Sequence, residues 1–309
     1  MSRILLTVFL MFTTAIFWYN FSSRYVGFVY NSKTQSKEFL LRNYSGLLLL
    51  EFDSSRKIDE AFDLFSSKGV KIIIGPPTSA EGEKLLPFLK KYKMVALSAT
   101  ISSTRLLNSS YIYSFTPSNA FITEKIKELL SKIGTKRLIL LSDPQNKQYS
   151  DEFVDLLKTF EGKNVYYYNE DTLKSIDVQT YDTVVMTLLA KEAAKAVKVL
   201  KSMNPSIKIV GTDSVMSVDF LSYAGNIVED TYLVYTMDYL ENPELGLIGE
   251  VSSFLSKHRF LSIDQFRRYL ERNVIETDIG IYHYENRSIS RPIRIFQVVN
   301  GQFKEVENF

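Results

Sequence analysis

Residues Ile72 to Leu89 read IIIGPPTSAEGEKLLPFL, and this stretch decides the fold class. Val70 to Ile74 is an uninterrupted apolar run, which is typical of a strand buried on both faces of a parallel sheet. The following Gly75-Pro76-Pro77-Thr78-Ser79 predicts a turn, and Ser79 stands where a helix N-cap is expected. A buried strand that leads through a turn into a helix is the basic unit of α/β proteins, so we expect an α/β fold.

The same alternation of strands and helices continues on both sides of this stretch. Short β-rich runs predict further strands, with apolar residues at helical spacing between them. The predicted strands are Tyr25 to Tyr30, Gly46 to Phe52, Met94 to Leu97, Leu138 to Leu141, Val165 to Tyr168, Thr183 to Thr187, Ile207 to Val210 and Tyr232 to Tyr235. Near the end of the chain, Asn300-Gly301 between two β-rich runs predicts a hairpin. We therefore expect parallel sheets with helices on both faces, in which ligands bind beyond the carboxyl ends of the strands.

The composition excludes several classes of functional site. The chain of 309 residues has no Cys, which rules out disulfides, Cys-ligated zinc, iron–sulfur clusters and a thiol nucleophile. It has only two histidines, so we do not expect a His-based metal site. It has 37 basic and 35 acidic residues, a nearly neutral balance that does not favour nucleic-acid binding. No dinucleotide-binding, P-loop, zinc-protease or nucleophile-elbow motif is present. Nothing in the sequence therefore indicates an enzyme, a cofactor or a metal.

The first residues predict a separate apolar segment. Met1-Ser2-Arg3 precedes Ile4 to Phe21, which contains no charged residue, and such an arrangement is typical of an export signal. As a helix, the stretch is about 27 Å long at ~1.5 Å per residue, close to the ~30 Å of a bilayer core. Trp18 and Tyr19 suit the membrane–water interface and occupy the place of a cleavage site. Residues 1–24 are thus expected to be an uncleaved anchor or a cleaved signal, with a buried helix as the third alternative.

Several segments resemble, in order, the periplasmic branched-chain amino-acid (Leu/Ile/Val) binding proteins, the type I solute-binding proteins of ABC transporters. Ile72 to Leu89 is similar to that family's strand, Gly-Pro-x-Thr-Ser turn and helix, including a proline inside the helix. Other similar segments are VALSATISSTRLL at 95–107, YSFTPSN at 113–119, LILLSDPQNKQYSDEF at 138–153, Asp278-Ile279-Gly280 and the closing hairpin at 293–306. The resemblance covers most of residues 25–309.

This resemblance implies the type I periplasmic-binding-protein fold: two doubly wound, Rossmann-like α/β lobes joined by three crossovers, preceded here by an apolar helix. The implied first lobe comprises residues 25–117 and 238–281, and the second comprises residues 118–237 and 282–309. The crossovers are expected near Phe115 to Asn119, Tyr235 to Tyr239 and Ile279 to Tyr282.

The resemblance also implies a ligand site in the cleft between the lobes. Ser79 and Thr100 would hold a ligand carboxylate with their hydroxyls, and the backbone at Ser98 and Ala99 would contribute an N–H. A helix N-terminus at Ser79 suits an anion, since it presents free N–H groups and a positive dipole. The alternatives are that Ser79 is a plain helix cap and that Ser98 and Thr100 only order their loop.

The second lobe would supply the other half of this site. Tyr149 would cover the ligand, and Asp213 would stand where an acid pairs with the ligand's ammonium group. A zwitterion would then bridge the lobes. The alternatives are that Asp213 caps the next helical turn and that Tyr149 is a surface aromatic residue.

The expected function is therefore that of an extracytoplasmic solute-binding receptor of an ABC importer, which binds an amino acid or a related small acid or amide. Its partners would be this ligand, an ABC permease and, through the first helix, the membrane. Only Asn31 to Ser45 separates the first two predicted strands, where the family usually has a long helix. This difference leaves open an alternative, a membrane-anchored sensing or protein-interaction domain that keeps the two lobes without transport.

Overall fold

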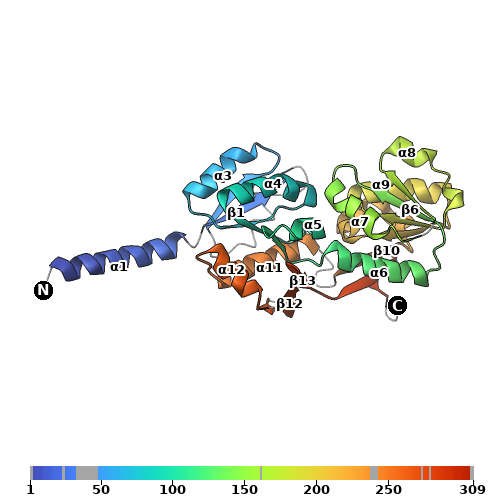
Figure 1. The fold of residues 1–309 in the computed structure, drawn as a ribbon. Coiled ribbons are helices and arrows are strands. Elements are labelled where there is room, and N and C mark those ends of the chain that lie inside the picture. Colours follow the sequence, from blue (N-terminus) through green and yellow to red (C-terminus); the bar gives the residue numbers. More distant parts are fainter. Residues whose placement is uncertain are drawn as a thin grey trace.

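The computed structural model describes residues 3–22, 25–32, 48–160, 162–236, 243–272, 274–277 and 280–306. Within these residues the chain forms two α/β lobes side by side, and helix α1 (Arg3–Ser22) projects away from the first lobe (Figure 1). Each lobe has a central sheet with helices on both faces. The prediction of two doubly wound lobes is confirmed.

The first lobe is built on a mostly parallel sheet with the strand order β11-β12-β13-β5-β4-β3-β1-β2. Its strands are β1 (Tyr25–Tyr30), β2 (Leu48–Asp53), β3 (Ile72–Ile74), β4 (Val95–Ser98), β5 (Ile112–Ser114), β11 (Ile275–Glu276), β12 (Ile281–Glu285) and β13 (Ser288–Ser290). Helices α3 (Ile58–Ser67), α4 (Ser79–Tyr92) and α5 (Thr104–Leu107) cover one face, and α11 (Pro243–Lys257) and α12 (Ile263–Leu270) cover the other. The all-isoleucine strand β3 lies between β4 and β1 and is buried, as its sequence predicts.

The second lobe has the strand order β15-β14-β10-β9-β8-β6-β7. Its strands are β6 (Leu138–Ser142), β7 (Lys163–Tyr167), β8 (Thr183–Met186), β9 (Lys208–Gly211), β10 (Tyr232–Thr236), β14 (Ile293–Val299) and β15 (Gln302–Glu305). Helices α6 (Asn119–Lys132) and α7 (Lys147–Leu156) pack on one face, and α8 (Glu170–Ser175), α9 (Ala190–Met203) and α10 (Val218–Ala224) pack on the other. Short 3₁₀ turns span Val178–Thr180, Asp213–Val215 and Gly225–Val228. The predicted Asn-Gly hairpin joins β14 to β15, with positive φ at both turn residues.

Two of the predicted crossovers agree with this topology as far as it is described. The first leads from β5 in the first sheet to α6 in the second lobe, and the second leads from β10 to α11. Residues 237–242 of the second crossover lie outside the described residues, as do residues 278–279 of the predicted third one.

The predicted position of the third crossover is wrong. Strands β12 and β13 form a hairpin whose turn residues Asn286 and Arg287 have positive φ, and β13 pairs with β5 of the first sheet. Tyr284 and Ile289 are buried in the core of the first lobe. Residues 282–290 therefore belong to the first lobe, and the chain crosses between β13 and β14. The reason is packing: Tyr284 of the hairpin stacks on Tyr113 of β5, and the hairpin extends the first sheet.

Helix α1 is apolar and exposed where its side chains are described. Its residues from Ile4 to Ile16 are exposed, Ile4 to 82% and Phe9 to 64%. In the described part of the chain, no helix is both long and apolar enough to span a membrane.

Candidate functional site

The first wall of the candidate site is the turn between β3 and α4. Gly75 has φ +99°, and a Cβ at this position would lie 2.4 Å from the carbonyl oxygen of Val29. Glycine, which has no Cβ, allows the turn to pass this close to the backbone of β1 without strain. The turn thus delivers the start of α4 to the carboxyl edge of the sheet, where ligands of α/β proteins bind.

The N-cap of α4 is Thr78, which corrects the prediction that Ser79 stands at this position. Thr78 accepts a hydrogen bond from the Glu81 N–H at 3.3 Å, and the Glu81 carboxylate accepts one from the Thr78 N–H at 3.2 Å. This reciprocal pair is a capping box, and the spacing Thr78-x-x-Glu81 was the signal for it in the sequence. Ser79 is instead the first residue of the helix and is buried.

The loop after β4 is ordered by Ser98. Its buried hydroxyl accepts hydrogen bonds from the N–H groups of Thr100 (3.1 Å) and Ile101 (3.0 Å), and donates one to the Pro76 carbonyl (2.9 Å). The Thr100 hydroxyl donates to the Pro77 carbonyl at 2.7 Å, and Ala99 is buried beside it. Ser98 and Thr100 therefore tie this loop to the turn before α4, so the structure brings Ser79, Ser98, Ala99 and Thr100 onto one wall.

The second wall carries Tyr149 and Asp213, which lie in direct contact. The Tyr149 hydroxyl, from α7, lies 2.5 Å from the Asp213 carboxylate and 2.7 Å from the Thr212 hydroxyl. Tyr149 is 3% exposed, so it is not a surface aromatic residue. Asp213 begins the 3₁₀ turn that Thr212 caps, beyond the end of β9.

Burial alters the ionisation of this pair. Desolvation raises the pKa of the Asp213 carboxyl group to about 6, although the nearby hydroxyl groups of Tyr149 and of Ser102 in the first lobe favour its charged form. Desolvation and the nearby Asp213 carboxylate raise the pKa of Tyr149 well above its usual value. A carboxylate that is poorly solvated and faces the opposite lobe is a favourable partner for a cationic group.

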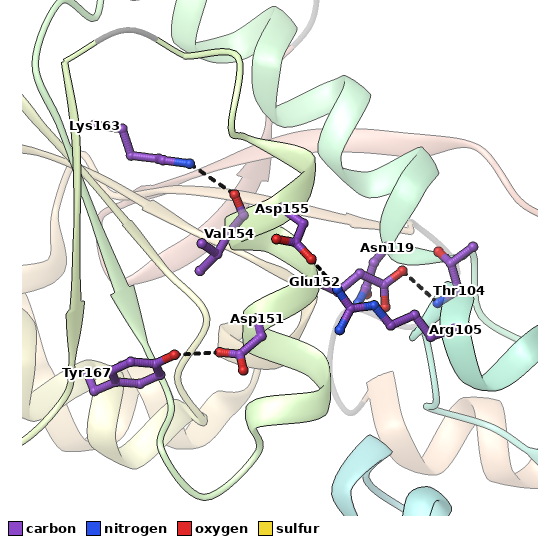
Figure 2. A network of polar contacts seen from close by, with 9 residues as sticks. All are labelled: Thr104, Arg105, Asn119, Asp151, Glu152, Val154, Asp155, Lys163 and Tyr167. Atoms are coloured by element: carbon purple, nitrogen blue, oxygen red, sulfur yellow. Dashed lines mark hydrogen bonds and ion pairs between the residues drawn. The ribbon is translucent and has the colours of Figure 1, made fainter.

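The two walls also touch through residues that the sequence does not mark as part of a site. The Asn146 side chain, just before α7, accepts a hydrogen bond from the Ala80 N–H of α4 at 3.0 Å. Glu152 of α7 accepts one from the Thr104 N–H of the first lobe at 2.9 Å, and the Asn119 side chain donates to its other oxygen at 3.2 Å. On the surface, Arg105 of α5 pairs with Asp155 of α7 (Figure 2).

Among the residues that the structure describes, no group of His, Cys, Asp and Glu side chains gathers closely enough to hold an ion.

Comparison with known proteins places this fold. No protein-family model and no curated protein matches the sequence. Solved structures do match: the branched-chain amino-acid transporter binding protein LivJ from Streptococcus pneumoniae, in complex with isoleucine, superimposes with a TM-score of 0.76 at 15% identity, over 91% of this chain and 99% of that one.

Two further structures agree with this match. The leucine-binding protein LivK from Thermotoga maritima has a TM-score of 0.72 at 13% identity, over 91% of this chain and 97% of that one. A solute-binding protein of an ABC transporter from R. palustris, in complex with benzoate, has a TM-score of 0.70 at 11% identity, over 92% and 95%. The chain therefore has the type I periplasmic-binding-protein fold, and the resemblance seen in the sequence is confirmed at the level of the fold.

Proposed function

We propose that this chain is an extracytoplasmic solute-binding receptor of an ABC importer, and that its ligand is an amino acid or a related small polar molecule held between the lobes. The observation that carries the proposal is the Tyr149–Asp213 pair beyond the strand ends of the second lobe, in which Tyr149 is buried and Asp213 is half-buried near Ser102 of the first lobe. An ammonium group would neutralise the poorly solvated Asp213 carboxylate.

In this proposal the carboxylate of the ligand binds the first lobe. The first-turn N–H groups of α4 and the Ser79 hydroxyl would hold it, because a helix N-terminus favours an anion. Thr100 would join them by turning its hydroxyl away from the Pro77 carbonyl. Ser98 already uses its hydroxyl within the loop, so its contribution with Ala99 would come from the backbone.

The proposal includes a non-enzymatic role and an ABC permease as partner. It also includes export of the two lobes across the membrane, with the apolar helix α1 acting as a cleaved signal or as an uncleaved anchor. The two-lobe fold and the exposed apolar face of α1 support these points. The direct hydrogen bonds between the lobes favour the second candidate, a membrane-anchored sensing or interaction domain, because they join the lobes through the chain's own groups.

A thermal-shift screen separates the two candidates. The chain is tested against single amino acids, with benzoate as an acid that lacks an ammonium group. A ligand at 100 times its dissociation constant stabilises the folded state by about 2.7 kcal/mol. We expect at least one amino acid to raise the unfolding temperature and benzoate to leave it unchanged, since benzoate offers nothing to Asp213. No shift with any amino acid at millimolar concentration would favour the second candidate.

A further inference from the structure

Helix α7 has two faces with different partners. One face is fixed in the second lobe: Tyr149 bonds to Thr212 and Asp213, and the Ser150 hydroxyl bonds to the Asp143 N–H (3.1 Å) and the Thr187 hydroxyl (2.8 Å). Because these contacts are buried, α7 moves with the second lobe as a rigid element.

The other face of α7 binds the first lobe. Asn146, at the start of the helix, accepts from Ala80, and Glu152, farther along, accepts from Thr104. Figure 2 shows Glu152 and Asp155 directed toward Thr104 and Arg105, while Asp151 points the other way to the Tyr167 hydroxyl of its own lobe.

The buried hydrogen bonds of Glu152 are expected to hold the lobes more strongly than the exposed Arg105–Asp155 ion pair. Glu152 is 4% exposed, and its hydrogen bonds go to neutral donors from Thr104 and Asn119. A buried carboxylate that loses such donors suffers a large desolvation penalty. The Arg105–Asp155 pair is 48% and 63% exposed, so solvent screens it and its contribution is small.

We propose that α7 is an interlobe latch: Asn146 and Glu152 hold the lobes together by accepting the Ala80 and Thr104 N–H groups. Donors and acceptors all belong to this chain, so the latch needs no bound molecule. One consequence rests on the proposed function, namely that a ligand carboxylate reaching the first turn of α4 displaces Asn146 from Ala80. The latch itself does not rest on that function.

The latch is tested by the distance between the lobes. The chain has no Cys, so Ser66→Cys on α3 and Lys174→Cys on α8, both exposed, introduce the two labelling sites in the full-length protein. Spin-label distances are measured in detergent without added solutes. We expect one distance population in this background. In the Asn146→Ala/Glu152→Ala variant, a longer population appears, and the ratio of closed to open molecules falls at least about tenfold.

Matched variants separate the latch from a general loss of stability. Asp151→Ala removes the neighbouring carboxylate of α7, which bonds within its own lobe, and is expected to leave the distances unchanged. Glu152→Gln keeps an acceptor oxygen and is expected to stay closed. Thr104→Pro removes the N–H donor at a first helical position that suits proline, together with the hydroxyl that accepts from the Ala120 N–H at 3.4 Å. It is expected to open the lobes even if the double variant does not fold. The proposal is overturned if the opening variants keep the distances of the background, or if Asp151→Ala opens the lobes equally.

Discussion

At the scale of single residues, Asp213 connects burial to a measurable pH dependence. The pKa of its carboxyl group is raised from 3.8 to about 6, chiefly by desolvation. Between these values the folded protein binds more protons than the unfolded chain. The free energy of unfolding contributed by this group is therefore greatest below pH 4 and falls as the pH rises through 6.

The corresponding prediction compares the wild type with Asp213→Asn, which keeps an acceptor for Tyr149 but has no charge. From pH 4 to pH 7 we expect the wild type to lose up to about 3 kcal/mol of unfolding free energy relative to the variant. Urea denaturation across this pH range measures the difference. A constant difference between the two proteins would mean that Asp213 is well solvated, contrary to this account.

The structural roles of the site residues could be predicted where a local sequence rule determines them. The turn before α4 follows from its turn residues, whereas the placement of Ser79 and Asp213 in different lobes came from the resemblance to the binding-protein family. The N-cap was assigned one residue too late, although Thr78 and Glu81 have capping-box spacing. Asn146 and Glu152 could not be predicted, because their partners Ala80 and Thr104 lie far away in the sequence.

At the scale of elements, the buried strands and their helices followed from periodicity, whereas the β12–β13 hairpin did not. Its strands are short, and exposed Ile281 (71%) lies on the same strand as buried Tyr284. Such strands are stabilised mainly by pairing with β5 and by packing, which are tertiary effects that alternation in the sequence does not report.

Helix α1 gives the prediction that belongs to this scale. Its described side chains, Ile4 to Ile16, are exposed rather than packed in either core. Removal of residues 1–24 should therefore change the unfolding free energy of the body by less than about 0.5 kcal/mol. Chemical denaturation of the two chains in the same detergent measures this change. A loss of several kcal/mol would indicate that the helix packs into a lobe.

At the scale of the whole molecule, one buried arginine connects the crossovers. Arg291 lies in the third crossover, between β13 and β14. Its side chain donates a hydrogen bond to the carbonyl of Phe115, in the first crossover, at 2.9 Å. It also forms an ion pair with Glu250 on α11, the helix that follows the second crossover. Both charged side chains are fully buried. We call the three crossovers together the hinge, and it is held by a charge pair that solvent does not screen.

Breaking this pair should be costly. Arg291→Met leaves Glu250 buried without its cationic partner, and we expect a loss of about 3–5 kcal/mol of unfolding free energy. The double variant Arg291→Met/Glu250→Leu should recover part of that loss, since it removes both charges. Denaturant titration of the single and double variants provides the measurement. A single variant that costs less than 1 kcal/mol would show that the pair does not stabilise the hinge.

The central claim is that the two lobes hold a zwitterion between Asp213 and the start of α4, and calorimetric titration at pH 7.5 with leucine or isoleucine tests it most directly. At this pH Asp213 is ionised, because its pKa is about 6. We predict that the wild type binds one of these amino acids and that Asp213→Asn weakens binding about tenfold or more, the loss of a charge-assisted bond worth ~1.5–3 kcal/mol. Ser79→Ala should lose less, since the N–H groups of α4 remain. Binding that is unchanged in Asp213→Asn, or no binding of either amino acid by the wild type, would contradict the claim.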